Sequence, residues 1–246
     1  MTVPFPSSLP TSPAQLSRTL PLRRAVYRTG RLAARERILE IGAGNGLVAT
    51  EIASRTGRKV TALDPKPFSA TLPGVERATG RGEDLPFESG SFDAIAFHFV
   101  LLWLTEPVAV LREALRVLSA GGVLLFLAEP DLTLRRDEPD TGLGRLIAGT
   151  ISEAGGHPNA GSALRGWLKE ADFRPKLHTT GEEWITVTDP EETLDEVRFL
   201  VAAGTLTEGD ADGLARAERE AVLTGSRRVL LPVTFGIAEK EDDFEL

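Results

Sequence analysis

The chain lacks cysteine altogether and has only three histidines among its 246 residues. Without cysteine there is no disulfide, no thiolate metal ligand and no cysteine nucleophile. The histidines, His98, His157 and His178, lie far apart in the sequence and do not have the spacing of a metal-binding motif. No metal site is therefore predicted.

Long apolar runs and an excess of positive charge are also missing. No stretch approaches the roughly 20 apolar residues that a membrane-spanning helix needs, and residues 1–13 lack the basic and apolar order of a secretory signal. The 28 basic and 36 acidic residues give a net charge of −8, which disfavours broad contact with a nucleic-acid backbone. We therefore expect a cytoplasmic protein with neither a nucleic-acid nor a membrane partner. A monomer or a homodimer is expected.

Short apolar strands and helices alternate through the first half of the chain. Strands are predicted at residues 37–41, 59–63, 75–78, 92–100 and 123–128, and helices at 47–55 and 107–118. A helix-like pattern over 14–34 is interrupted by Pro21. Such alternation is typical of βαβ units, so we predict an α/β fold with a parallel sheet covered on both faces.

The second half is less regular. Its apolar spacing predicts helices at residues 141–154, 160–171, 190–203 and 210–224, and strands at 177–187 and 229–237.

The sequence ILEIGAGNG at residues 38–46 predicts a strand, a tight turn and the start of a helix. Glycine suits such a turn because it accepts positive φ and leaves the first backbone N–H groups of the helix open to a ligand. The pattern here is G-x-G-x-G, and Leu47 stands where a dehydrogenase has its third glycine. No Gly-Lys-Ser/Thr follows, so a phosphate-binding P-loop is excluded as well.

Acidic residues stand close to the ends of the predicted strands. A carboxylate at Glu40 would repel a pyrophosphate and suits a cation or an amino group, although it could instead pair with a nearby arginine. Asp64 ends the second strand, where an acid reaches ribose hydroxyls in doubly wound folds; the alternative is an Asp-Pro turn. Glu83 or Asp84 could accept a hydrogen bond from an exocyclic amine such as that of adenine, or be a solvated loop acid.

Four stretches occur here in a characteristic order and spacing: ILEIGAGNG, TALDPKP, GEDLPFESGSFDAI and LREALRVLSAGGVLLF. Together they resemble the class I S-adenosylmethionine-dependent methyltransferases, in the small-molecule branch that includes quinone-biosynthesis and trans-aconitate-type enzymes. The resemblance spans about residues 36–130. It implies a Rossmann-like, doubly wound, mostly parallel seven-stranded sheet with an antiparallel last strand and helical cap or insertions. The implied cofactor is S-adenosylmethionine, the product S-adenosylhomocysteine, and the reaction methyl transfer to a small molecule.

The same resemblance implies a division of the chain and a set of cofactor contacts. The chain would be one methyltransferase domain over 1–246, with a helical segment at 1–35, the cofactor-binding core at 36–130 and a variable substrate side with closing strands at 131–246. The methionine end of the cofactor would contact Glu40, Gly42, Ala43, Gly44 and Gly46, and the ribose would contact Asp64 with Pro65. The adenine would lie against Leu85 with Asp84 or Glu83. At the end of the fourth strand, Phe97 and His98 would also contact the cofactor.

The reaction centre is less well marked than the cofactor site. His98 leaves the fourth strand where the family borders the transferred methyl, so it is a candidate general base in the imidazole range, with a packing or cofactor-contacting role as the alternative. Substrate contacts are expected from the variable parts, with Tyr27, Arg135, Arg136 and His157 as candidates that could equally be ordinary exposed groups.

Two other functions remain open at the level of the sequence. One is a nicotinamide-dependent oxidoreductase, against which Leu47 argues. The other is a methyltransferase-like protein that binds cofactor or a partner without turnover, since a fold does not guarantee chemistry.

Overall fold

A seven-stranded sheet forms the centre of the protein, in the order β3-β2-β1-β4-β5-β10-β7. The computed structural model describes residues 12–66, 69–181 and 183–240. Strands β1 to β5 run parallel, whereas β10 is antiparallel to both β5 and β7. The fold class predicted from the sequence is thereby confirmed. The strands are β1 (Ile38–Ile41), β2 (Val60–Asp64), β3 (Val75–Thr79), β4 (Phe92–His98), β5 (Leu118–Pro130), β7 (Phe173–Thr179) and β10 (Val233–Lys240).

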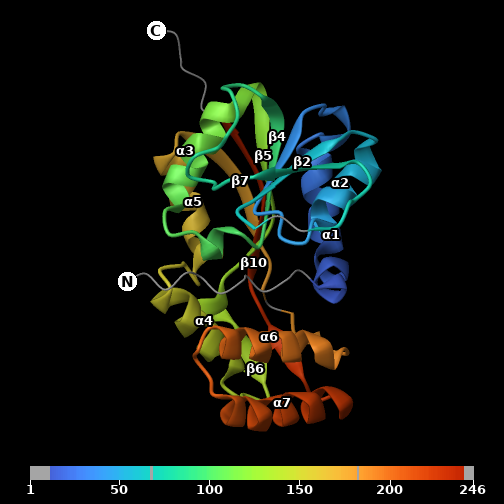
Figure 1. Cartoon of the computed structure of the whole chain (residues 1–246), viewed down its shortest axis with the longest axis vertical. Helices are drawn as coiled ribbons and strands as arrows, with labels where there is room; N and C mark the ends of the chain where they lie inside the picture. The colour runs from blue at the N-terminus through green and yellow to red at the C-terminus, as the bar shows by residue number, and fades with distance from the viewer. Residues whose placement is uncertain (1–11, 67–68, 182, 241–246) are drawn as a thin grey trace.

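Helices cover both faces of this sheet (Figure 1). Alternate strand residues point to opposite faces, so Ile95 and Phe97 of β4 join one apolar cluster and Ala94 and Ala96 join another. The first cluster is completed by α3 (Pro107–Val117) and α5 (Ala160–Glu170), the second by α1 (Pro13–Thr29) and α2 (Leu47–Thr56). The two-sided burial explains why the central strands read as nearly continuous apolar runs.

A smaller unit, here called the cap, lies beyond one end of the sheet, at the bottom of Figure 1. It contains a second sheet in the order β6-β9-β8, which the sequence did not predict. Its strands are β6 (Arg136–Glu138), β8 (Ile185–Thr186) and β9 (Arg228–Leu230), and its helices are α4 (Leu143–Glu153), α6 (Pro190–Ala202) and α7 (Glu208–Leu223).

Buried ion pairs connect the elements of the cap. The fully buried guanidinium of Arg227 donates to Glu218 and to Asp137, both at 2.6 Å. Arg135 donates to Asp137 and, through both terminal nitrogens at 2.8 Å, to Glu196 on α6. Because each buried cation has carboxylate partners, the desolvation cost of the charges is offset.

Several predicted boundaries are wrong. Helix α1 continues through Pro21, because one missing N–H bond is outweighed by the burial of its core-facing side chains. Strand β5 begins at Leu118, immediately after α3, rather than at residue 123, and Gly121 (φ +71°) lies within it.

The predicted strands 177–187 and 229–237 each divide between two sheets. β7 begins at Phe173 and ends at Thr179, while Ile185–Thr186 belongs to the cap. The last strand is interrupted before Val233, so that β9 lies in the cap sheet and β10 in the main sheet. Proline at 232 has no N–H for a ladder, which accounts for the break.

Candidate functional site

The turn between β1 and α2 follows the predicted course and leaves one side open. Gly42 (φ +71°) and Gly44 (φ +53°) both have left-handed backbone angles that favour glycine. A Cβ at Gly42 would collide with Val100, whereas a Cβ at Gly44 would meet nothing within 4 Å. The N–H groups of Gly42 and Ala43 donate to Leu63 O at 2.9 and 3.0 Å, which holds the turn against β2. Gly44 therefore borders free space in which a ligand can approach the backbone.

Asp64 connects the end of β2 to this turn. Its Oδ2 accepts from the N–H of Gly44 at 2.9 Å, and its Oδ1 accepts from the N–H of Lys66 at 2.8 Å. The second bond is the turn-forming role foreseen as an alternative. Each carboxylate oxygen keeps a second lone pair, so the ribose contact is compatible with the turn and stays a prediction.

Glu40 is a buried carboxylate, only 2% exposed. Its Oε2 has no hydrogen-bond partner among the described residues. Burial raises the pKa of Glu40 to about 8. A hydrogen bond from the backbone of Ala49 and the charge of Arg23 act to lower this pKa, whereas the charges of Asp64 and Glu51 act to raise it. No arginine forms an ion pair with Glu40 in the described part of the chain, so the arginine-paired alternative is not observed. A buried carboxyl with one oxygen unpartnered among the described residues, close to the glycine turn, fits the amino group of an incoming ligand.

A polar cluster from α1 faces Glu40. The buried guanidinium of Arg23 donates to Glu51 Oε2 through Nε and Nη2 at 2.9 and 2.6 Å, and through Nη1 to Thr19 Oγ1 at 2.5 Å. The Tyr27 hydroxyl is buried without a partner among the described residues, and burial raises its pKa. Sequence reasoning missed Thr19 and Arg23. Their spacing of four residues with Tyr27, on one helix face, is the signal that was available.

His98 contacts this cluster from the end of β4. Its Nε2 lies 3.4 Å from Thr19 Oγ1, while its Nδ1 is buried without a partner in the described structure. The Thr19 hydroxyl gives its single hydrogen to Gln15 O at 2.9 Å, so its oxygen accepts from Arg23 and from His98 Nε2–H. Nδ1 then carries a lone pair.

The electrostatic setting of His98 bears on its predicted role. Burial, with a further contribution from Arg23, lowers the pKa of His98 to about 3. The ring is therefore neutral at physiological pH and a weak base. This favours a positioning role over a base that titrates near neutrality, although both remain predictions.

The remaining cofactor candidates lie in different surroundings. Leu85 is buried and its N–H donates to Glu113 Oε2 at 3.0 Å, whereas the neighbouring Asp84 is exposed. Glu83 pairs with Arg81 at 3.3 Å. Pro65 is exposed on the loop after β2.

Phe97 lies in the core, away from the polar cluster. Its ring is stacked on Phe126 with centroids 5.1 Å apart, on the opposite face of β4 from its neighbour His98. Its predicted cofactor contact is untested and stays a prediction.

A cavity of about 990 Å³ begins beside the polar cluster and extends toward the cap. Thr19 of α1 and Phe99, next to His98, lie in its wall. Most of the wall is apolar and comes from four places: α1, the 3₁₀ turn after β4 (Leu101–Trp103), α4 and the cap strands. The cavity therefore reaches the carboxyl edge of the sheet. A ligand in the cavity could there approach a ligand bound at the glycine turn.

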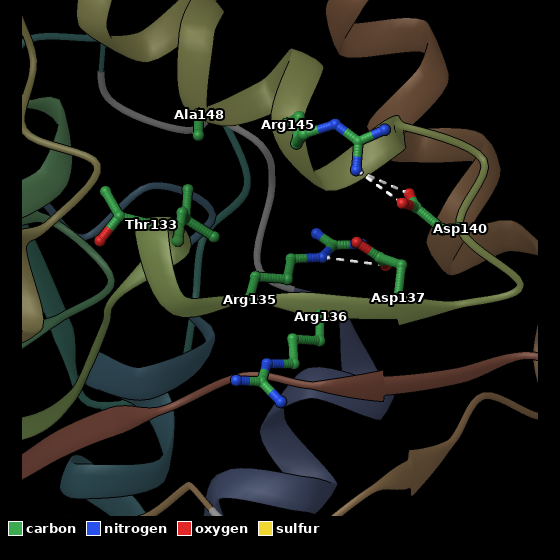
Figure 2. A pocket seen from close by; sticks show the side chains of 8 residues that line it. Thr133, Arg135, Arg136, Asp137, Asp140, Arg145 and Ala148 are labelled. Atoms are coloured by element: carbon green, nitrogen blue, oxygen red, sulfur yellow. Dashed lines mark hydrogen bonds and ion pairs between the residues drawn. The ribbon is translucent and has the colours of Figure 1, made fainter.

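A second cavity, of about 300 Å³, lies within the cap (Figure 2). Figure 2 shows Arg145 directed at Asp140 and Arg135 directed at Asp137, with Arg136 on the other side of its strand. Arg145 and Arg135 already have these carboxylate partners, whereas the larger cavity has Thr19 of the polar cluster and Phe99, next to His98, in its wall. We therefore place the candidate active site at the larger cavity.

The predicted substrate residues are not brought together. Arg135 lines the larger cavity, but its guanidinium is held by Asp137 and Glu196. Tyr27 lies beside Glu40 and Glu51, whose charges act on its hydroxyl. His157 lines neither cavity; its ring packs edge-on against Trp167. Their roles remain predictions.

The comparisons with known proteins agree with this arrangement. Residues 39–126 match the family model described as Methyltransferase domain. The chain is 37% identical over 105 residues to a ubiquinone/menaquinone biosynthesis C-methyltransferase of Rhizobium meliloti, covering 37% of this chain and 40% of that protein. It is 30% identical over 176 residues to the enzyme of the same name from Sinorhizobium fredii, covering 62% of this chain and 67% of that protein.

A solved structure shares the fold. The phosphoethanolamine N-methyltransferase 2 of Haemonchus contortus aligns with a TM-score of 0.58 and 17% identity, covering 94% of this chain and 54% of that one. The chain belongs to the class I S-adenosylmethionine-dependent methyltransferases. The family and its cofactor, S-adenosylmethionine, are thereby confirmed as the sequence predicted them. The match to the Rhizobium meliloti relative spans well under half of that protein's length, so activity and substrate are treated as proposals.

Proposed function

We propose that this protein transfers the methyl group of S-adenosylmethionine to a small-molecule acceptor. One observation carries the proposal. The buried Glu40 carboxyl, whose Oε2 has no partner in the described structure, and the open side of Gly44 lie at the carboxyl edge of the sheet. The cavity of about 990 Å³ begins at the same edge, where Thr19 in its wall contacts His98. The protein thus has adjoining places for a cofactor with an amino group and for a second molecule.

The residues of this chain suit S-adenosylmethionine. Glu40 would pair with the ammonium group, and the backbone at Gly44 would lie along the methionine end. Asp64 would accept from the ribose hydroxyls. The buried Leu85 with Asp84 or Glu83 would flank the adenine. In support, the Haemonchus contortus structure with this fold was determined in complex with S-adenosyl-L-methionine.

The cofactor, when bound, supplies a methyl group already activated by the sulfonium. The task that falls to the protein is to align an acceptor and to exclude water. The Nδ1 lone pair of His98 can accept a hydrogen bond near the cavity. On the opposite side of the ring Nε2–H donates to the Thr19 hydroxyl, which is itself held by Arg23. We assign His98 to positioning rather than to proton removal, because burial lowers its pKa to about 3.

Calorimetry tests the cofactor assignment. S-Adenosylhomocysteine should bind and NAD should not; the reverse result would favour the oxidoreductase.

Turnover is tested by incubating the protein with methyl-labelled S-adenosylmethionine and pooled low-mass metabolites. Label should enter a small molecule with the wild type and not with Gly44→Val, whose side chain would occupy the open space beside the turn. Cofactor binding without any label transfer would support the binding-protein alternative.

A further inference from the structure

We propose that the acceptor is an apolar molecule without negative charge, which binds in the larger cavity. The inference rests on the proposed function and concerns the charge and polarity that this cavity accepts. It comes from the lining of the cavity and from the state of every positively charged group on it.

The wall of the cavity is apolar over most of its extent. Leu22 of α1 and Leu102 and Trp103 after β4 form the side toward the sheet. The facing side comes from the cap, with Ile147 and Ile151 of α4 together with Val187, Val229 and Leu231. Such a lining binds a ligand mainly through burial of apolar surface, and a volume of about 990 Å³ can hold a molecule of several rings or a long chain.

The cations on the wall are already neutralised. The described lining contains two, Arg18 and Arg135. Arg18 forms a double ion pair with Glu192 of α6, with Nη1 2.8 Å from Oε1. Arg135 has Glu196 on both terminal nitrogens and Asp137 in addition. Neither guanidinium is left for a carboxylate or phosphate of a ligand.

Carboxylates outnumber cations on the same wall. Glu183, Glu192, Asp195 and Glu196 line it, against the two arginines. Asp195 accepts from Arg198, a cation outside the lining, at 2.6 Å. Among the described residues one carboxylate, Glu183, is therefore left beyond those paired with arginine. The residues outside the described part of the chain, 1–11, 67–68, 182 and 241–246, include no lysine, arginine or histidine. No side chain there can supply the missing positive charge.

An anionic acceptor would therefore have to take an arginine from its carboxylate or remain unpaired in an apolar space with no free cation among the described lining residues. Both cost free energy, because a charge removed from water needs a partner. A neutral acceptor meets no such penalty, and the carboxylates of the wall can pair with a cationic one.

Competitive binding tests this inference without knowledge of the natural acceptor. The neutral fluorophore N-phenyl-1-naphthylamine is bound to the full chain saturated with S-adenosylhomocysteine. It is then displaced by three ligands with one ring system: 2-naphthylmethanol, 2-naphthylmethylammonium and 2-naphthoate. We expect the alcohol and the ammonium to compete and the carboxylate to bind at least about tenfold more weakly, as expected for an unpaired like charge.

Freeing one arginine should change this order. Glu192→Gln leaves Arg18 without its carboxylate, so 2-naphthoate should gain about tenfold in affinity relative to the alcohol. Glu191→Gln is the matched control, since Glu191 is exposed on the same helix, pairs with Arg198 and does not line the cavity. Leu22→Trp should weaken the alcohol by filling the cavity while S-adenosylhomocysteine still binds.

Wild-type binding of 2-naphthoate as tightly as the alcohol would overturn the inference. So would failure of all three ligands to bind while S-adenosylhomocysteine binds normally. Loss of S-adenosylhomocysteine binding in the wild type would instead contradict the proposed function. The charge preference of the cavity would still be measurable by displacing the fluorophore with the same three ligands in the absence of S-adenosylhomocysteine. The two failures are therefore distinguishable.

Discussion

Binding of S-adenosylhomocysteine should release a proton from Glu40 near neutral pH. Burial raises the pKa of this carboxyl to about 8. At pH 7 it is then about 0.9 protonated, and at pH 9 about 0.1. An ammonium group placed beside it favours the ionised form. Binding should therefore release up to about 0.9 proton at pH 7 and about 0.1 at pH 9.

Calorimetry in two buffers measures this number. The apparent enthalpy of binding differs between phosphate and Tris, whose own ionisation enthalpies differ, in proportion to the protons released. Glu40→Gln cannot release this proton and should also bind more weakly by roughly 1.5–3 kcal/mol, the value of a charge-assisted hydrogen bond.

Glu129→Gln is the matched control. Glu129 is also fully buried with its pKa raised to about 8, but it accepts from the N–H groups of Val100 and Leu101 rather than facing the glycine turn. Its substitution should leave the proton release in place. Equal wild-type enthalpies in the two buffers at pH 7 would refute the assignment of Glu40 to an amino group.

Four further predictions follow from the same geometry. Asp64→Ala should weaken S-adenosylmethionine binding by roughly 1.5–3 kcal/mol; an unchanged dissociation constant would exclude the ribose contact. Gly44→Val should abolish binding, whereas Gly57→Val, at a glycine with similar φ and equally open space, should lower only the stability. His98→Gln should lower turnover, keep cofactor binding and leave the pH profile between 6 and 8 unchanged, since the pKa of His98 is about 3; an activity limb lost with the substitution would identify a base instead. Because the pKa of Glu129 rises from 4.5 to about 8 on folding, its stabilisation is complete below about pH 4.5 and is lost toward pH 8. Urea titrations should show wild type losing stability relative to Glu129→Gln over that range, by at most about 1.4 kcal/mol per pH unit.

The first half of the chain was predictable because its signals are local. The turn at Gly42 and Gly44 needs backbone angles that few other residues adopt, and the apolar runs before and after it have the lengths of buried strands. Helices α2 and α3 and strands β1 to β4 therefore begin and end within two residues of the predicted positions. The cofactor and fold class follow from the same motifs.

The cap was only partly predictable, for a physical reason. Its helices have clear apolar spacing, but its strands are two or three residues long and are held by partners distant in the sequence. A run such as 229–237 looks like one strand, since nothing local indicates that β9 and β10 enter different sheets. Pro232 was the one available sign.

The amino-acid sequence by itself determined the class of fold, the glycine turn and the acids at the strand ends, because each depends on a few neighbouring residues. Only the tertiary structure decided the setting of those groups. It buried Glu40 with its Oε2 unpartnered among the described residues, and it placed His98 against Thr19. It also paired Arg18 with Glu192 across 174 positions of sequence and Arg135 with Glu196, so that neither arginine of the described cavity lining is free. Burial and pairing depend on which distant segments pack together, and no local pattern contains that information.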